Sequence, residues 1–280
     1  MQQLEFVKMH GIGNDFIIAD FTKSGLKGLD LGRLAVRMCD RNFGVGADGV
    51  LLVLPSETAD FRMRLINSDG SEAEMCGNGV RVVAKYLFDR GMCGESVTVE
   101  TLGGTKVMEL EARNGTAVGA TVNMGAPRLD ARDIPVSGYR GKVINRPLEV
   151  DGVMHEITCV SMGNPHCVLF VDAVEEVPLE KLGPRLETHP AFPQKTNVEF
   201  AQVVKPDDLI VRVFERGAGV TLACGTGACA SVVAGVLTGR CGRQATVHLP
   251  GGKLLIDWRE DGDVYMTGPA EEVFIGTYPL

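Results

Sequence analysis

The feature that most constrains the fold of this chain is an internal repeat. Residues 75–79, Met-Cys-Gly-Asn-Gly, recur 148 positions later as residues 223–227, Ala-Cys-Gly-Thr-Gly. A Gly-Asn pair followed by an apolar run that ends in Asp occupies residues 13–20 and returns at residues 163–172. Matches at nearly the same offset predict two similar half-chains, each with strands and one central helix.

Local patterns place the repeated motifs between strands and helices. Residues 61–65 alternate apolar and charged side chains, which is typical of a half-buried strand. Asn114-Gly115 and Asp151-Gly152 favour hairpin turns. Helical periodicity is confined to three segments, at residues 31–38, 80–88 and 232–237. We therefore expect each Cys-Gly-x-Gly to open a helix, and we expect irregular stretches near residues 125–147 and 183–195.

The bulk properties narrow the class of protein. The chain has 280 residues, enough for two domains, and 28 basic against 36 acidic side chains give a net charge of −8. This balance argues against nucleic acid or an anionic membrane as a partner. No apolar run reaches the roughly 18 residues of a membrane span, and the first ten residues lack an apolar signal core. We therefore expect a cytoplasmic protein that acts on a small molecule.

Eight cysteines need an explanation. Without a secretory signal a disulfide framework is not expected, and the absence of any C-x₂-C pair argues against structural zinc. A single cysteine is usually a small buried apolar residue. Cys76 and Cys224 differ from the other six because each lies in a copy of the repeat, at the start of an expected helix.

A cysteine at a helix N-terminus lies where free backbone N–H groups and the helix dipole favour negative charge. The pKa of a thiol can fall there from about 8.5 to between about 3.5 and 7.5. The neighbouring glycines let backbone amides approach a bound anion. Each half-chain therefore offers a thiol acid–base group beside an anion cradle.

Two such groups suit one reaction class. Inversion of a stereocentre by proton transfer needs a base on one face of a carbon and an acid on the other. Amides directed at the substrate carboxylate would stabilise the carbanion, each by about 2.7–4 kcal/mol. We therefore predict an amino-acid racemase or epimerase in which Cys76 and Cys224 exchange roles. Nothing in the sequence indicates a pyridoxal lysine site.

At these residues the chain resembles the diaminopimelate epimerase family, and the resemblance covers almost its whole length. Six sequence blocks match in order, at residues 8–16, 44–49, 67–81, 163–166, 196–200 and 215–227. The family implies a cofactor-independent, metal-free epimerase that interconverts LL- and meso-diaminopimelate for lysine and peptidoglycan synthesis, and it suggests a homodimer.

The family's residue roles carry over by position. Cys76 and Cys224 match the two acid–base cysteines. The turns that hold the carboxylate at the reacting carbon match Gly77, Asn78, Gly225 and Thr226. The residues that hold the rest of the substrate match Asn14, Asn67, Asn164, Asn197, Glu215 and Arg216. Arg216 can grip a carboxylate bidentately and Glu215 can pair with an ammonium group. His166 is a possible accessory residue, and a structural histidine is an equal alternative.

The family fold is α/β, with two similar domains related by a pseudo-twofold axis, each a β-sheet wrapped around a central helix. The resemblance implies a first half-domain at residues 1–120 plus 264–280, which carries Cys76, and a second at residues 121–263, which carries Cys224. The active site is expected in the cleft between them. One departure is Gly49, where some members have glutamine, so a contact from that side chain is absent or replaced by backbone.

Other interpretations stay open. The paired Gly-x-Gly turns could be tight strand-to-helix connections only, and Asn14 or Asn164 could be simple turn residues. A proline racemase-like enzyme would usually read Cys-Gly-His at residues 76–78, and phenazine-type isomerases lack the cysteine pair. A non-catalytic binding protein or a thiol redox protein on the same fold is a further alternative.

Overall fold

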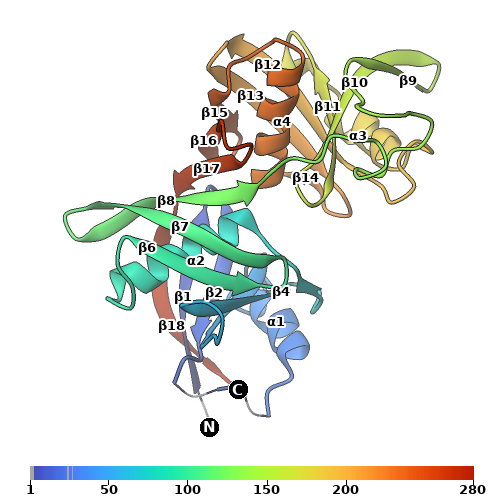
Figure 1. Ribbon diagram of the computed structural model, residues 1–280. Helices are drawn as coiled ribbons and strands as arrows, with labels where there is room; N and C mark the ends of the chain where they lie inside the picture. The colour runs from blue at the N-terminus through green and yellow to red at the C-terminus, as the bar shows by residue number, and fades with distance from the viewer. Residues whose placement is uncertain (1–2, 24, 27) are drawn as a thin grey trace. The chain divides into compact units, whose positions relative to one another are not determined.

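The chain forms two compact units. The computed structural model describes residues 3–23, 25–26 and 28–280 (Figure 1). Unit 1 comprises Met1–Asn123 and Thr267–Leu280, and unit 2 comprises Met124–Met266. The half-domain boundaries expected from the family lie three residues from these divisions. Four residues of the expected first half-domain, Met1, Gln2, Ser24 and Lys27, lie outside the described residues.

Unit 1 is built on one continuous run of strands. β18 pairs with β1, β1 with β2, β3 with β4, β6 with β7 and β7 with β8, all antiparallel, while β2–β3 and β4–β6 are parallel. A two-residue strand, β5, adds to β4. The strands are β1 (Gln3–Gly11), β2 (Asn14–Asp20), β3 (Gly49–Leu54), β4 (Phe61–Asn67), β5 (Glu72–Ala73), β6 (Ser96–Thr101), β7 (Gly104–Arg113), β8 (Thr116–Gly125) and β18 (Glu271–Pro279).

Unit 2 repeats the same order of pairings. β9–β10, β10–β11, β12–β13 and β15–β16 are antiparallel, β11–β12 and β13–β15 are parallel, and the short β14 adds to β13. The strands are β9 (Arg146–Val150), β10 (Val153–Ser161), β11 (Pro165–Phe170), β12 (Asn197–Lys205), β13 (Asp208–Glu215), β14 (Gly219–Thr221), β15 (Gln244–Leu249), β16 (Gly252–Trp258) and β17 (Val264–Pro269), which reaches across the division. The internal repeat is thus confirmed strand by strand.

The register makes the equivalence of single residues explicit. Phe16 of β2 lies opposite Gly49 of β3, and His166 of β11 lies opposite Asn197 of β12. Two residues further on, Leu51 and Glu199 are therefore equivalent positions of the two units.

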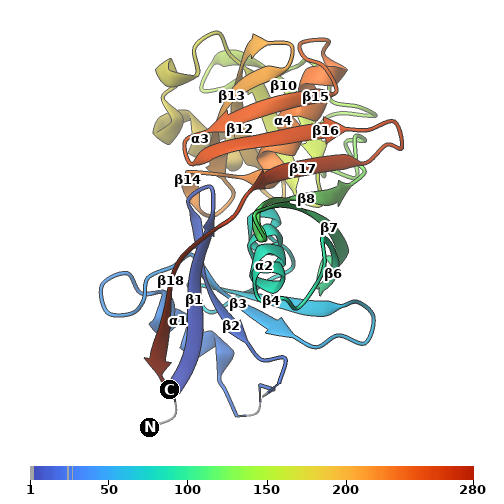
Figure 2. The ribbon, with the colours of Figure 1, turned by 90° about the vertical axis from the view of Figure 1, so that its left-hand side faces the viewer.

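Each unit encloses one buried helix. α2 (Gly77–Asp89) packs against β1, β2, β3, β4 and β7, and α4 (Gly225–Leu237) packs against β10, β11, β12, β13, β15 and β16. Figure 2 shows the strands of unit 1 curving around α2. Residues 77–87 of α2 and most of α4 are buried. The mixed α/β fold with a sheet wrapped around a central helix is therefore confirmed.

The local predictions hold with one exception. The hairpin turns at Asn114 and Asp151 have the positive φ values, 52° and 51°, that such turns require. The expectation of an irregular stretch at residues 183–195 was wrong at its start, because the helix α3 (Leu179–Glu187) includes Gly183 and Pro184. Burial of Leu179 and Leu186 on one face stabilises this helix against the unfavourable proline.

The remaining helices are short. α1 (Leu31–Cys39) begins after Asp30, whose carboxylate accepts the Arg33 N–H, and buries the predicted face of Leu34, Ala35 and Met38. A 3₁₀ turn spans Val174–Glu176. Within the part of the chain that the structure describes, no helix is long and apolar enough to cross a membrane.

Candidate active site

Cys76 and Cys224 are the N-cap residues of the two central helices. Both have extended backbone angles, with φ −139° and −121°, and each Sγ accepts from the N–H group three residues later, Gly79 at 3.5 Å and Gly227 at 3.4 Å. The prediction that each Cys-Gly-x-Gly opens a helix is confirmed. Each sulfur therefore lies at the positive end of a helix dipole, among amides that an anion can share.

In unit 1, Asn14 and Asn78 lie beside Cys76. The Cys76 Sγ donates to Asn14 Oδ1 at 3.6 Å, and Asn78 Nδ2 donates to the same oxygen at 3.2 Å. The buried Arg81 guanidinium donates to Asn78 Oδ1 at 2.8 Å and to the Gly77 carbonyl at 3.3 Å. The amides of Asn78 and Asn14 are thus held in fixed orientations around the thiol.

A carboxylate behind Asn14 fixes its other end. Asp48 Oδ2 accepts from Asn14 Nδ2 at 2.7 Å and from the Asp15 N–H at 3.1 Å. Arg41 bridges Asp15 and Asp48, and Lys8 also contacts Asp15. Although burial of Asp15 opposes it, hydrogen bonds from Arg41 and Lys8 hold the pKa of that carboxyl below its usual value. Asp15 is therefore ionised, and the Asp48 carboxyl anchors Asn14.

In unit 2, Thr226 and Asn164 lie beside Cys224. Thr226 Oγ1 is 3.5 Å from Cys224 Sγ, and Asn164 Nδ2 donates to Thr226 Oγ1 at 3.3 Å. Thr226 is the counterpart of Asn78 and Asn164 is the counterpart of Asn14. The polar shell around the cysteine is thus repeated, with a hydroxyl in place of one amide.

His166 extends this shell into the core. Its Nε2 is 3.0 Å from Asn164 Oδ1 and its Nδ1 is 2.7 Å from Glu199 Oε1. His166 and Glu199 are both fully buried. The second carboxylate oxygen, Oε2 of Glu199, has no hydrogen-bond partner. His166 therefore hydrogen-bonds directly to Asn164, a predicted substrate contact, and lies in a fully buried polar cluster.

The electrostatics of Cys224 oppose thiolate formation. Burial, followed by the charges of Glu215 and Glu199, raises the pKa of Cys224 well above its usual value, against hydrogen bonds from Thr226 and the Gly227 N–H. Burial also raises the pKa of Glu215, against hydrogen bonds from Thr221 and Cys224. In this state Cys224 is a thiol at neutral pH, so the depressed pKa that its helix position alone suggested is not found.

The other predicted contact residues are engaged by backbone groups or, for Asn67, by a serine side chain. Asn197 is buried, donates to the Pro165 carbonyl at 2.8 Å and accepts the Arg216 N–H at 3.0 Å, so both ends of its amide are engaged. Arg216 is exposed and donates to the Gln194 carbonyl at 3.3 Å. The Asn67 amide, at the end of β4, donates to Ser71 Oγ at 3.0 Å.

Gly49 is tightly packed. A Cβ at this position would lie 2.8 Å from Leu65 Cδ1 and 2.9 Å from the Ile66 carbonyl oxygen. A glutamine at residue 49 would require β4 to shift. This packing gives a physical reason why the chain has glycine where some family members have glutamine.

Two residues that contact the site were not given a role by sequence reasoning. Asp48 and Glu199 both lie inside matched blocks, at residues 44–49 and 196–200. The available signal for Glu199 was a charged residue between two apolar ones, Val198 and Phe200, near the start of β12. A carboxylate buried at such a position is costly and needs a reason.

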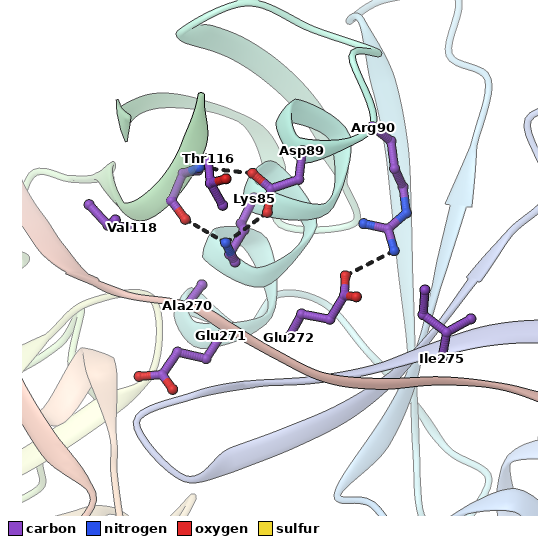
Figure 3. A pocket seen from close by; sticks show the side chains of 10 residues that line it. Lys85, Asp89, Arg90, Thr116, Val118, Ala270, Glu271, Glu272 and Ile275 are labelled. Carbon is purple, nitrogen blue, oxygen red and sulfur yellow. Dashed lines mark hydrogen bonds and ion pairs between the residues drawn. The ribbon is translucent and has the colours of Figure 1, made fainter. Parts of the chain in front are cut away.

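Unit 1 also has an open pocket of about 880 Å³ at the C-terminal end of α2 (Figure 3). Lys85 pairs with Asp89, and Arg90 pairs with Glu272 of β18 at its wall. None of the predicted site residues lines it. Across the described residues, no group of three or more His, Cys, Asp or Glu side chains is arranged to hold a metal ion.

Comparisons with known proteins agree with the sequence motifs. The diaminopimelate epimerase family model matches residues 6–129 and 158–273. A diaminopimelate epimerase of Pelotomaculum thermopropionicum is 56% identical over 277 residues, covering 99% of both chains. One of Heliobacterium modesticaldum is 53% identical over 281 residues, covering 99% of this chain and 100% of the relative.

Solved structures with low identity share the fold. A hydroxyproline epimerase of Agrobacterium vitis matches with a TM-score of 0.73 at 15% identity, over 99% of this chain and 91% of that one. A Bacillus anthracis phenazine biosynthesis protein of the PhzF family matches with a TM-score of 0.72 at 18% identity, over the whole of both chains. By the family model and by full-length relatives above 50% identity, the chain belongs to the diaminopimelate epimerase family.

Proposed function

We propose that this chain interconverts LL- and meso-diaminopimelate by moving the α-proton between Cys76 and Cys224. The observation that carries the proposal is that both cysteines are N-caps of buried, equivalent helices, each with glycine-spaced amides beside the sulfur. A protein that used these turns only as connections would not need a thiol at both.

In this mechanism one cysteine, as thiolate, removes the α-proton from one face of the carbon. The other, as thiol, delivers a proton to the opposite face, and the reverse reaction exchanges the roles. The protein that results has the protonation states of the two sulfurs interchanged, so proton exchange with water must reset it before another turnover in the same direction.

The carbanion needs electrostatic stabilisation. We propose that the N–H groups around Gly77 and Asn78, and around Gly225 and Thr226, bind the carboxylate at the reacting carbon. Preformed donors of this kind each contribute about 2.7–4 kcal/mol where charge develops. Their orientation is set by the helix, so no reorganisation is needed during the reaction.

The remaining predicted residues are proposed to hold the rest of the substrate. Glu215 is suited to pair with an ammonium group. A bound cation would lower the raised pKa of Glu215 and favour its carboxylate form. Arg216 is exposed and free to grip a carboxylate once it releases the Gln194 carbonyl. Asn14, Asn67, Asn164 and Asn197 complete the proposed contacts.

The two units are proposed to act as the half-domains of the family fold, and the chain to act as a cytoplasmic homodimer that feeds lysine and peptidoglycan synthesis. The exposed apolar side chains of β18, which pairs with β1, support a dimer. Val273, Phe274 and Ile275 are 55%, 45% and 67% exposed. Exposed apolar edges of this kind favour association.

The test is NMR of the reduced protein with LL-diaminopimelate in D₂O, before and after thiol alkylation. α-Deuteration together with the appearance of the meso isomer, both lost on alkylation, is the expected result. A folded, reduced protein that exchanges no α-proton of diaminopimelate but racemises proline would overturn the proposal in favour of a proline racemase-like activity.

A further inference from the structure

The two units differ at one pair of equivalent core positions beneath the cysteine-bearing helix. In unit 1 the pair is Phe16 and Leu51, and in unit 2 it is His166 and Glu199. All four side chains are at most 2% exposed. The fold therefore accepts an apolar pair at these positions, and packing alone does not explain the histidine and the carboxylate.

The position of Glu199 relates it to Cys224. A Cβ on Gly227, the residue whose N–H contacts the Cys224 sulfur, would lie 2.7 Å from Glu199 Oε1 and 3.3 Å from Cys224 Sγ. The equivalent Cβ on Gly79 would meet Leu51 Cδ2 at 3.3 Å. Glu199 thus lies directly under the turn that presents the sulfur.

Keeping a carboxylate there is unfavourable for stability. Glu199 has no exposed surface and its Oε2 accepts no hydrogen bond. Replacement of a buried ionic pair by apolar residues of similar volume is often neutral or stabilising. A buried group left partly unsatisfied in this way calls for a role other than stability.

A chain of hydrogen bonds connects Glu199 with Cys224 through His166, Asn164 and Thr226, and the donors in it follow one direction. Asn164 Oδ1 only accepts, so the 3.0 Å contact requires a hydrogen on His166 Nε2. The contact between Nδ1 and Glu199 Oε1 then holds one shared proton, and either placement of that proton keeps the Nε2 hydrogen in place. With its Oδ1 engaged, Asn164 directs Nδ2 to Thr226 Oγ1. The hydroxyl hydrogen of Thr226 remains available for Cys224 Sγ at 3.5 Å.

We propose that Glu199 is a positioning residue, which acts through His166 and Asn164 to direct the Thr226 hydroxyl as a hydrogen-bond donor toward Cys224. This proposal rests on the proposed function. The donor lowers the cost of forming a thiolate at a sulfur that is buried and close to Glu215. Glu199 itself contacts neither the sulfur nor, in the proposed reaction, the substrate.

The decisive variant transfers the unit 1 pair into unit 2, as His166→Phe with Glu199→Leu. Both side chains are removed together, so neither buried group is left without its partner. The protein is expected to fold, because the same pair packs in unit 1, and its kcat is expected to fall roughly 10- to 100-fold, as for other residues that orient a reacting group. KM is also expected to rise, because Asn164, a proposed substrate contact, loses the partner of its Oδ1. A folded variant with kcat within about twofold of wild type would overturn the proposal.

A double-mutant cycle separates positioning from packing. Thr226→Val removes the terminal donor, so combining it with the transferred pair should add little to the loss from either alone. Additive losses would overturn the proposal. If the transferred pair does not fold, Glu199→Gln takes its place in the cycle. Gln can donate to or accept from Nδ1 and so no longer dictates the tautomer. An unchanged kcat or additive losses with that variant would also overturn the proposal.

Alkylation gives a readout that does not depend on turnover. Mass spectrometry of iodoacetamide-treated protein should show slower labelling of Cys224 in the transferred-pair variant, with the rate at Cys76 unchanged. The control is Asp208→Asn, since His248 and Asp208 form another histidine–carboxylate pair at 2.6 Å, at the opposite end of β13 from Glu215. Wild type that fails to epimerise diaminopimelate would refute the proposed function alone. A Cys224 labelling rate that is unchanged or faster would refute the positioning role, and a faster rate would show that the charge of Glu199 outweighs the hydrogen bond from Thr226.

Discussion

Asn14 and Asn164 occupy equivalent positions of the two units and present opposite ends of their amides to the start of the central helix of their own unit. Asn14 directs Oδ1 to Cys76, whereas Asn164 directs Nδ2 to Thr226 beside Cys224. The group behind each amide decides the orientation. Asp48 is an acceptor and draws Nδ2, and His166 donates and draws Oδ1.

The first prediction concerns the two thiols. Cys76→Ala and Cys224→Ala are each expected to abolish net epimerisation, because each removes the proton carrier on one face of the carbon. Conversion of LL- to meso-diaminopimelate by NMR is the measurement. Cys93→Ala, a half-buried cysteine in unit 1 outside the site, serves as the control and should keep full activity. A single Cys76 or Cys224 variant with a near-normal rate would refute the two-base scheme.

A second prediction follows from the anchor of Asn14. Asp48→Ala releases Asn14 Nδ2 and the Asp15 N–H, so the amide is free to rotate. Loss of this charge-assisted hydrogen bond, of about 1.5–3 kcal/mol, should raise KM roughly tenfold or more, with a smaller effect on kcat. Steady-state kinetics test this. The matched control, Asp60→Ala, removes another unit 1 carboxylate, one that accepts from Thr98, and it should leave KM unchanged.

The glycines at the helix starts give a third prediction. Gly227→Ala should be more damaging than Gly79→Ala, because its Cβ would lie 2.7 Å from a buried carboxylate oxygen, whereas that of Gly79 would meet a leucine methyl at 3.3 Å. We expect a lower Tm and a strong loss of kcat for Gly227→Ala alone, from thermal unfolding and kinetics. Equal effects of the two substitutions would contradict the asymmetry of the two cores.

Alkaline stability is the subject of a fourth prediction. Burial raises the pKa of Cys39, Cys93 and Cys241 from 9.0 to about 11. Such thiols keep their protons longer in the folded protein than in the unfolded chain, so their contribution is complete below about pH 9 and is lost as pH rises through 11. The free energy of unfolding in urea, with reductant, should therefore fall steadily between pH 9 and 11. A flat or rising curve would contradict these shifts.

The fifth prediction tests the dimer. Ile275→Glu introduces a charge on the exposed apolar strand β18, where it should weaken association and leave the unit folded, because Ile275 is 67% exposed. Sedimentation velocity should show a dimer for wild type and a shift toward monomer for the variant. The control is Val153→Glu, at another exposed apolar residue, on β10 in unit 2. A wild type that sediments as a monomer would refute the homodimer.

Much of the fold and part of the site could be predicted from the sequence, because both follow local rules. The repeat and its glycine-spaced cysteines indicated α2 and α4 with Cys76 and Cys224 at their starts, since capping depends on adjacent residues. α3 was partly missed because Pro184 within it disfavours a helix in isolation, and burial of Leu179 and Leu186 depends on contacts made by the folded unit.

The contacts behind the site could not be read from the sequence. Asp48 lies 34 positions from Asn14, and Glu199 lies 33 positions from His166, so only the parallel pairing of neighbouring strands brings them together. The pKa of Cys224 likewise depends on contacts that the sequence does not reveal. Its helix position suggested a depressed value, but burial, Glu215 and Glu199 all raise it, and none of these is visible in the Cys-Gly-x-Gly motif.

The pairing of β18 with β1 has a consequence for how the protein is made on the ribosome. Unit 2 is one uninterrupted stretch of chain, whereas unit 1 needs a strand that is translated after all of unit 2. Unit 2 can therefore complete its own strand pairings during synthesis while β1, which already pairs with β2, still lacks β18 on its other side. The nascent N-terminal unit, although made first, is the last to finish folding.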